Sequence, residues 1–150
     1  MATIKSSRYI TPIRQLVDEW DKRLTLLSKT IDEWITCQRR WLYLEQIFST
    51  PDIQLTQETK IFAQVDKTWK ELMRRTEQQP NALKAATQPG TLELLQTNNA
   101  QMEKIQRALE DYLETKRLAF PRLFFLSNED LLDILSHSKD AHCVQVRTIV

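Results

Sequence analysis

The chain has 150 residues, of which 41% are hydrophobic and 27% charged, a composition that fits one folded domain and excludes a disordered chain. Its 21 basic and 20 acidic residues give a formal net charge of +1, which argues against a nucleic-acid binder and against a polybasic membrane anchor. The only glycine, Gly90, excludes a glycine-rich phosphate-binding loop and leaves few tight hairpins, so the sequence favours helices joined by other turns.

A first long helix is expected from Thr11 to Phe48, with Thr11 as its cap and Pro12 in its first turn. At 1.5 Å per residue this helix would be about 55 Å long. Its apolar residues alternate four and three apart, as in the a/d seam of a heptad repeat: Ile13, Val17, Trp20, Leu24, Leu27, Ile31 and Trp34, widened by Leu16 and Ile35. The seam could pair with another chain as a coiled coil or pack on later helices of the same chain. The presence of further amphipathic helices favours the second arrangement.

The first helix is expected to end at residues 49–52, because Pro51 cannot continue it. Thr56 is expected to cap a second helix that extends to about Gln79 and ends before Pro80. One face of this helix is apolar: Ile61, Phe62, Val65, Trp69, Leu72 and Met73. Residues 81–87 suggest a short helical turn, and residues 88–90 a connector.

A third long helix is expected from about Thr91 to Leu118, and residues 120–122 stop it. Its buried face consists of Leu95, Met102, Ile105, Leu109 and Tyr112, with Leu92, Leu113 and Leu118 nearby. The apolar run 123–126 indicates a buried extended segment. Ser127 then caps a last helix, whose apolar residues are Leu131, Leu132, Ile134 and Leu135.

These elements predict an all-α fold: an elongated bundle of three long helices plus a short C-terminal helix, with little or no sheet. The expected organisation is a flexible N-terminus at 1–10, a helical bundle at 11–135 and a divergent C-terminal tail at 136–150. No run of about 18 apolar residues predicts a membrane span. Two distant cysteines and the lack of a signal peptide suit an intracellular, reducing compartment.

The sequence predicts no catalytic, cofactor-binding or metal-binding residues, and therefore no enzyme and no cofactor. His137, His142 and Cys143 are close in sequence, but their spacing matches no zinc pattern and Cys37 lies far upstream. The acidic residues alternate with basic ones, as at 18–23, which indicates a solvated helix face and not a catalytic pair.

Tryptophans are the aromatic residues of most interest, and each lies on or beside an apolar stripe: Trp20, Trp34, Trp41 and Trp69. Core packing is the favoured interpretation for them. The alternative is that a tryptophan at the edge of a stripe docks another domain.

Several strings in the sequence resemble the linker region of dynein heavy chains. They are DEW at 32–34, CQRRWLYLE at 37–45 and STPDI at 49–53, followed in family order by YLE at 112–114, KR at 116–117, FPRLFFLS at 120–127 and DLLDILS at 130–136. The string NALKAATQPG at 81–90 is similar to the axonemal branch in particular. The resemblance covers roughly residues 5 to 145. Residues 54–58 differ, because this stretch is shorter than the family's usual loop and has Thr56 where proline is common.

The resemblance implies a non-catalytic mechanical segment, a truncated part of a linker without the AAA+ ATPase ring. In that family, ATP hydrolysis in the ring makes the linker bend and straighten, which moves the motor along microtubules. Implied partners are the remainder of a dynein motor, including the ring, and other dynein chains; microtubules would be reached only indirectly, and no nucleic acid or membrane is implied. The implied location is the cytoplasm and cytoskeleton, with the cilium axoneme favoured. The alternative function is a self-standing helical adaptor that binds a partner through the first-helix heptad.

Overall fold

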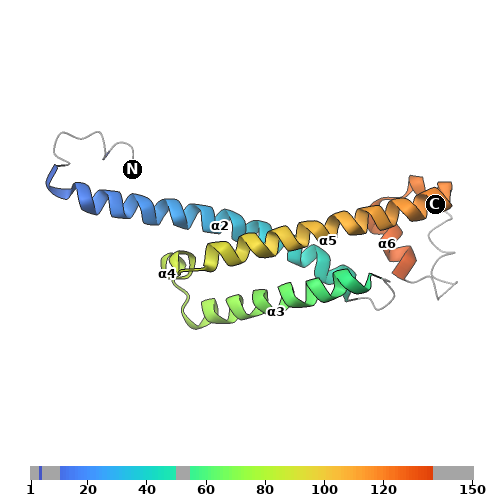
Figure 1. Cartoon of the computed structure of the whole chain (residues 1–150), viewed down its shortest axis with the longest axis horizontal. Coiled ribbons are helices and arrows are strands. Elements are labelled where there is room, and N and C mark those ends of the chain that lie inside the picture. Colours follow the sequence, from blue (N-terminus) through green and yellow to red (C-terminus); the bar gives the residue numbers. More distant parts are fainter. Residues whose placement is uncertain (1–3, 5–10, 50–54, 137–150) are drawn as a thin grey trace.

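The computed structural model describes residue 4, residues 11–49 and residues 55–136. Within these ranges the order is a 3-10 turn η1 (Thr11–Ile13), α2 (Arg14–Phe48), α3 (Thr56–Gln78), α4 (Ala82–Thr87), α5 (Thr91–Ala119), a 3-10 turn η2 (Pro121–Phe125) and α6 (Asn128–Ser136). No strand occurs in the described part of the chain. The elongated all-α fold of three long helices and a short final helix is therefore confirmed (Figure 1).

The helix ends agree with the expected boundaries, but two of the expected caps are wrong. Thr11 lies in η1, and α2 follows Ile13 with no side-chain cap. Thr56 is the first residue of α3 and does not cap it either. By contrast, the Asn81 side chain caps α4 by accepting a hydrogen bond from Lys84 N at 3.0 Å. The Ser127 hydroxyl caps α6 as expected and accepts from Asp130 N at 3.1 Å.

The connector before α5 depends on the chain's only glycine. Gly90 has φ 83°, in the left-handed region that a side chain disfavours. Its carbonyl accepts a hydrogen bond from Leu94 N at 3.0 Å, which begins the next helix. The glycine thus sets the direction in which α5 leaves the short helix α4.

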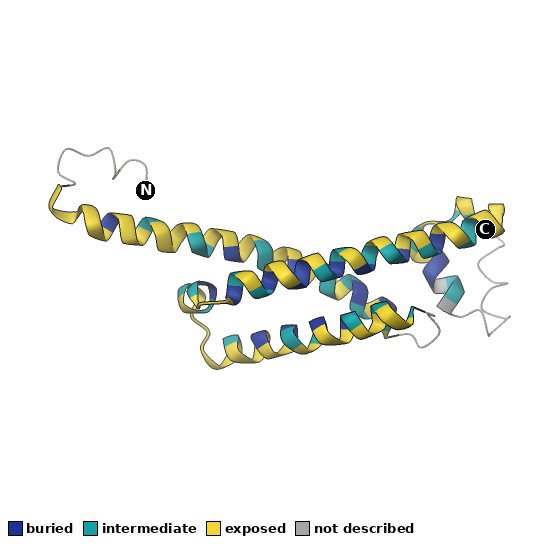
Figure 2. Cartoon of the chain, in the orientation of Figure 1, coloured by how far each residue is buried: buried dark blue, intermediate teal, exposed yellow. Residues whose placement is uncertain are grey.

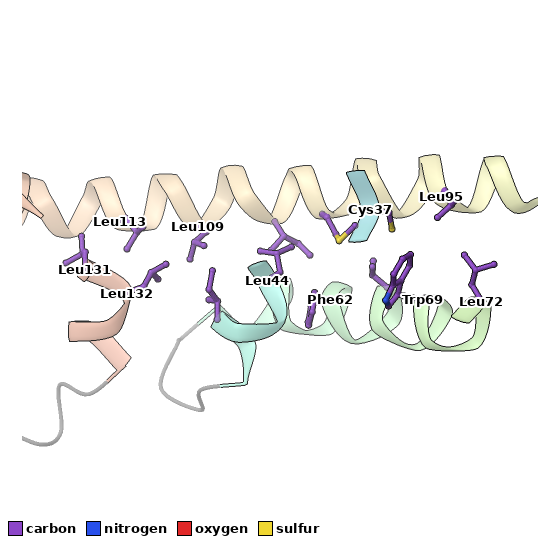
Figure 3. Close-up of a cluster of buried hydrophobic side chains, with 14 residues drawn as sticks. Cys37, Leu44, Phe62, Trp69, Leu72, Leu95, Leu109, Leu113, Leu131 and Leu132 are labelled. Atoms are coloured by element: carbon purple, nitrogen blue, oxygen red, sulfur yellow. The ribbon is translucent and has the colours of Figure 1, made fainter. Parts of the chain in front are cut away.

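The core lies between α5 and the other helices, since α5 contacts α2, α3, α4, η2 and α6. Figure 3 shows its apolar side chains pointing toward one another from α2, α3, α5 and α6. The members are Cys37, Leu44, Ile47, Phe62, Val65, Trp69, Leu72, Leu95, Met102, Ile105, Leu109, Leu113, Leu131 and Leu132. The apolar faces expected for the second and third helices are largely confirmed, although Met73 and Leu118 are exposed.

The heptad seam of α2 packs on the later helices at Trp34, as expected, but not along its N-terminal half, although Val17 near its start is buried. The N-terminal half of α2 extends beyond the rest of the bundle (Figure 1), and its surface is mostly exposed (Figure 2). Ile13, Trp20, Leu24 and Ile31 are all exposed. A different side of α2, with Thr30, Cys37 and Leu44, faces the core.

Residues 123–126 do not form the buried extended segment that their composition suggested. Residues 121–125 form the 3-10 turn η2, in which Phe124 and Phe125 face solvent and Phe125 is 92% exposed. Leu123 and Leu126 pack against the core instead. The Arg117 side chain holds the turn by donating to Leu126 O at 2.8 Å and to Leu123 O at 3.4 Å.

Candidate functional site

The most specific set of contacts in the structure joins α2, α3 and α5 at the middle of the molecule. We call this set the junction; its residues are Glu33, Trp34, Cys37, Arg40, Trp41, Asp66, Thr68, Trp69, Asn98, Asn99 and Glu103. It combines a buried apolar layer, an aromatic cluster and a group of polar side chains. Because these residues come from three helices, the junction fixes how the long helices are placed along one another.

Two hydrogen bonds at the junction use backbone carbonyls of the facing helices. Asn99 Nδ2 on α5 donates to Glu33 O on α2 at 3.0 Å and to the Glu33 carboxylate at 2.6 Å. In the opposite direction, Arg40 Nη1 on α2 donates to Asn99 O on α5 at 2.9 Å. Because a carbonyl cannot move without its helix, sliding α5 along α2 by one turn would break both bonds.

A half-buried ion pair and a hydroxyl complete the polar part of the junction. Arg40 Nη1 lies 3.7 Å from Glu103 Oε2 on the next turn of α5. Glu103 also pairs with Arg107, four residues further along α5. The Thr68 hydroxyl on α3 lies 3.2 Å from Asn98 Oδ1 on α5. The polar contacts therefore reach all three helices.

Three of the four tryptophans belong to the junction or border it. Trp69 is 3% exposed, and its ring centroid lies 6.3 Å from that of Trp34 and 6.1 Å from that of Trp41. Trp41 Nε1 donates to Asp66 Oδ1 at 3.0 Å, so its polar edge is satisfied. Core packing is thus confirmed for these three residues. Trp20 differs: it is exposed on the projecting half of α2, with the Arg23 guanidinium 5.7 Å from its ring centroid.

The thiol at the junction is unsuited to nucleophilic chemistry. Cys37 is fully buried, and burial raises the pKa of its thiol to about 12, assisted by the negative charge of Glu33 and opposed by Arg40. At neutral pH the sulfur stays protonated, so it acts as a small apolar side chain. The junction holds helices together and has no group poised to react.

The described residues contain no group of three or more His, Cys, Asp or Glu side chains that could hold a metal ion. His137, His142 and Cys143, considered above as a metal site, lie outside the described residues. The acidic residues at 18–23 lie on the projecting part of α2. None of the helices that the structure describes has the length and apolarity needed to cross a bilayer.

Sequence reasoning missed the polar residues of the junction. Asn98 and Asn99 are buried, although asparagine is a residue type that is usually exposed. One signal was present, because a face drawn through Leu95, Met102 and Leu109 passes over residues 98 and 99. Two adjacent amides at such positions indicate that the facing helices supply hydrogen-bond partners.

Comparison with known proteins places this helical unit in a family. The family model described as "Dynein heavy chain, N-terminal region 2" matches residues 1–148. Dynein axonemal heavy chain 6 of Homo sapiens is 56% identical over 147 residues, which are 97% of this chain and 4% of that protein. Dynein axonemal heavy chain 3 of Mus musculus is 47% identical over 145 residues, or 95% and 4%. Dynein axonemal heavy chain 2 of Mus musculus is 45% identical over 147 residues, or 97% and 3%. The chain thus spans only a few per cent of the length of these relatives.

Proposed function

This chain belongs to the dynein heavy chain family, and from that membership we propose that it is a non-catalytic mechanical segment of a dynein motor, corresponding to part of the linker. Its task is to transmit the conformational change that ATP hydrolysis produces elsewhere in the heavy chain. The observation that supports this role best is the junction, where hydrogen bonds to backbone carbonyls tie α2 and α5 in both directions. A segment that carries force between its ends needs long helices that do not slide along one another.

The proposed partners follow from the relatives. These are axonemal heavy chains by name, so we place this segment in the cytoskeleton of a ciliary axoneme. Its direct partners would be the remainder of the heavy chain, including an AAA+ ring, and other dynein chains. Microtubules would be reached only through those parts. Family membership also favours this role over that of a self-standing adaptor.

The test compares two neighbouring arginines in a full-length axonemal heavy chain that carries this segment. Arg40→Met keeps the aliphatic stem and removes the hydrogen bond to Asn99 O, a charged donor contact worth about 1.5–3 kcal/mol. Arg39→Met is the control, because Arg39 is exposed. We expect Arg40→Met to slow microtubule gliding several-fold while ATP turnover and microtubule binding stay near the level of the control.

Three results would contradict the proposal. If Arg40→Met and Arg39→Met glide at the same velocity, the junction does not transmit force. If the purified 150-residue chain turns over ATP, the segment is not a purely mechanical one. A loss of gliding that comes with an equal loss of ATP turnover would also count against it, because the defect would then lie in the chemistry and not in its transmission.

A further inference from the structure

A pocket with a basic rim lies between the end of α3 and the short helix α4. Its volume is about 310 Å³, and the described residues that line it belong to the ranges 72–79 and 84–88. The helix α4 packs on α2 and α5, beside the end of α3 (Figure 1). We call this space the basic pocket.

Two cationic side chains line the basic pocket, one from each helix. Arg75 belongs to α3 and Lys84 to α4, and both residues are exposed. Neither forms an ion pair with a residue that the structure describes, although Glu71 lies one turn before Arg75 on α3. None of the described lining residues is acidic, so the two positive charges are not neutralised inside the pocket.

The other polar groups of the pocket add hydrogen-bond donors. The hydroxyls of Thr76 and Thr87 already donate to carbonyls one turn earlier in their own helices, at 2.9 and 2.6 Å. Gln79 and Gln88 each present a side-chain amide that can donate. The donors open to a ligand are therefore a guanidinium, an ammonium and two amides. The chemical group that such a set recognises is an oxyanion.

Aliphatic carbon in the lining narrows the choice of oxyanion. Leu72 is buried and Ala85 half-buried, and both line the pocket. A carboxylate on a short aliphatic stem can place its methylene groups against these two residues while its oxygens meet the cations. A phosphate has the charge but no such stem. Among acidic side chains glutamate has the longer stem, so it fits the pocket better than aspartate.

Local hydrogen bonds hold the walls of the pocket in place. Gln79 N donates to Arg75 O at 3.2 Å and Asn81 N donates to Gln79 O at 2.7 Å, which fixes the turn between the two helices. The Asn81 side chain then caps α4 by accepting from Lys84 N at 3.0 Å. Because both cations stand on backbone that is already ordered, binding an anion between them requires little rearrangement of the chain.

We propose that the basic pocket binds the side-chain carboxylate of a glutamate from another protein segment. The Arg75 guanidinium donates to both oxygens of that carboxylate, in the forked geometry that arginine favours, and the Lys84 ammonium pairs with one of them. The stem of the glutamate lies against Leu72 and Ala85. This inference concerns recognition at one end of α3 and does not depend on the mechanical role proposed above.

Nuclear magnetic resonance titration of the 150-residue chain tests the proposal, with butanoate as the probe. Butanoate has the atoms of a glutamate side chain from Cα outward. Butanamide has the same stem without the charge, and inorganic phosphate has a charge without the stem. At constant ionic strength, butanoate should saturably shift the Arg75 Nε–H signal and the amides of residues 84–88. Its Kd should be at least about fivefold lower than that of either other compound.

Two neighbouring arginines supply the matched variants. Arg74 and Arg75 are both exposed on α3, but at 3.6 residues per turn Arg74 lies about 160° around the helix from Leu72 and faces away from the pocket. Arg75→Gln should raise the Kd for butanoate at least about tenfold, because it removes a charged donor, and Arg74→Gln should raise it less than about twofold. Both substitutions are on an exposed helix surface, so circular dichroism should show both variants folded.

Three results of the titration would overturn the proposal. They are the lack of a saturable shift with butanoate, binding of phosphate or butanamide as tight as that of butanoate, and an equal loss of affinity in the two arginine variants.

Carbodiimide treatment of a full-length axonemal heavy chain that carries this segment then identifies the occupant, because the reagent joins a lysine amine to a carboxylate in contact with it. Lys84 should link to a glutamate outside the segment. Lys67, exposed on the far side of α3, is the control and should not give that link. No link from Lys84 beyond its own segment, or the same link from Lys67, would also contradict the proposal. Neither measurement needs motility, so both are independent of the gliding experiment.

Discussion

Trp69→Ala is the substitution expected to destabilise the bundle most clearly. Trp69 is 3% exposed and lies against two other tryptophan rings at 6.3 and 6.1 Å. Truncation of a buried tryptophan to alanine typically costs about 3–5 kcal/mol. Each aromatic pair adds about 0.5–1.5 kcal/mol to stability. Trp69→Ala should therefore lower the free energy of unfolding by about 4–5 kcal/mol, near the upper end of the range for such truncations.

The matched control is Trp20→Ala, on the projecting half of α2. Trp20 is 40% exposed, and the Arg23 guanidinium lies 5.7 Å from its ring centroid, an exposed contact worth about 0.5–1 kcal/mol. In the isolated chain, Trp20→Ala should therefore lower the free energy of unfolding by less than about 1 kcal/mol. The two substitutions remove the same atoms, so any difference between them reports the surroundings of the ring.

Urea denaturation followed by far-ultraviolet circular dichroism measures both variants. With a slope of about 2 kcal/mol per molar urea, Trp69→Ala should lower the midpoint by about 2 M and Trp20→Ala by less than about 0.5 M. If Trp69→Ala does not fold, Trp69→Phe should give an intermediate shift, because it keeps one aromatic ring in the cluster. Equal midpoint shifts for the two alanine variants would refute the assignment of Trp69 to the centre of the junction.

Three further predictions concern the ends of the helices and the buried thiol. In urea melts, Asn81→Ala should lower the free energy of unfolding by about 1 kcal/mol, because it removes the side-chain cap of α4. Thr56→Ala is the control and should change it little, because the Thr56 side chain does not cap α3. Equal losses for the two variants would contradict this. Arg117→Gln should speed amide hydrogen exchange in η2 several-fold, because two backbone carbonyls lose their donor, and unchanged exchange would show that the turn holds without it. In a Cys143→Ser background, Cys37 should react with a thiol reagent at pH 8 only as fast as the chain unfolds. The pKa of Cys37 is raised from 9.0 to about 12, so its contribution to stability is complete below pH 9 and is lost as the pH rises toward 12; rapid labelling of folded protein would disprove the burial.

Helix boundaries were predictable because local chemistry sets them. Proline at 80, the connector 88–90 and the Ser127 cap each act on residues within one turn, so their effects can be read without knowing the fold. The Thr11 and Thr56 caps were wrong for a related reason. A hydroxyl before a helix can cap it only if its backbone is extended there, and both threonines are themselves in helical turns.

The partner of an apolar face was not predictable in the same way. The heptad pattern showed that α2 has an apolar side, and the structure shows that it has two. Periodicity gives the direction of a face, but not which element covers it. The helix that covers the core side, α5, is distant in sequence: Asn99 is 66 residues from its hydrogen-bond partner Glu33.

The arrangement of contacts also says how force would pass through the segment. The helices α2, α3, α4 and α6 all contact α5, whereas α2 and α3 meet mainly through their aromatic side chains. Load entering at α6 therefore reaches α2 through α5, and it passes from one helix to the other at the junction.

At the junction, apolar packing alone would resist separation of the helices better than sliding, because one leucine can replace another in a similar pocket one turn away. The hydrogen bonds from Asn99 to the carbonyl and carboxylate of Glu33 and from Arg40 to Asn99 O must break before the two helices can slide. The buried polar residues at the junction thus supply resistance to sliding, which a purely apolar interface between two long helices would lack.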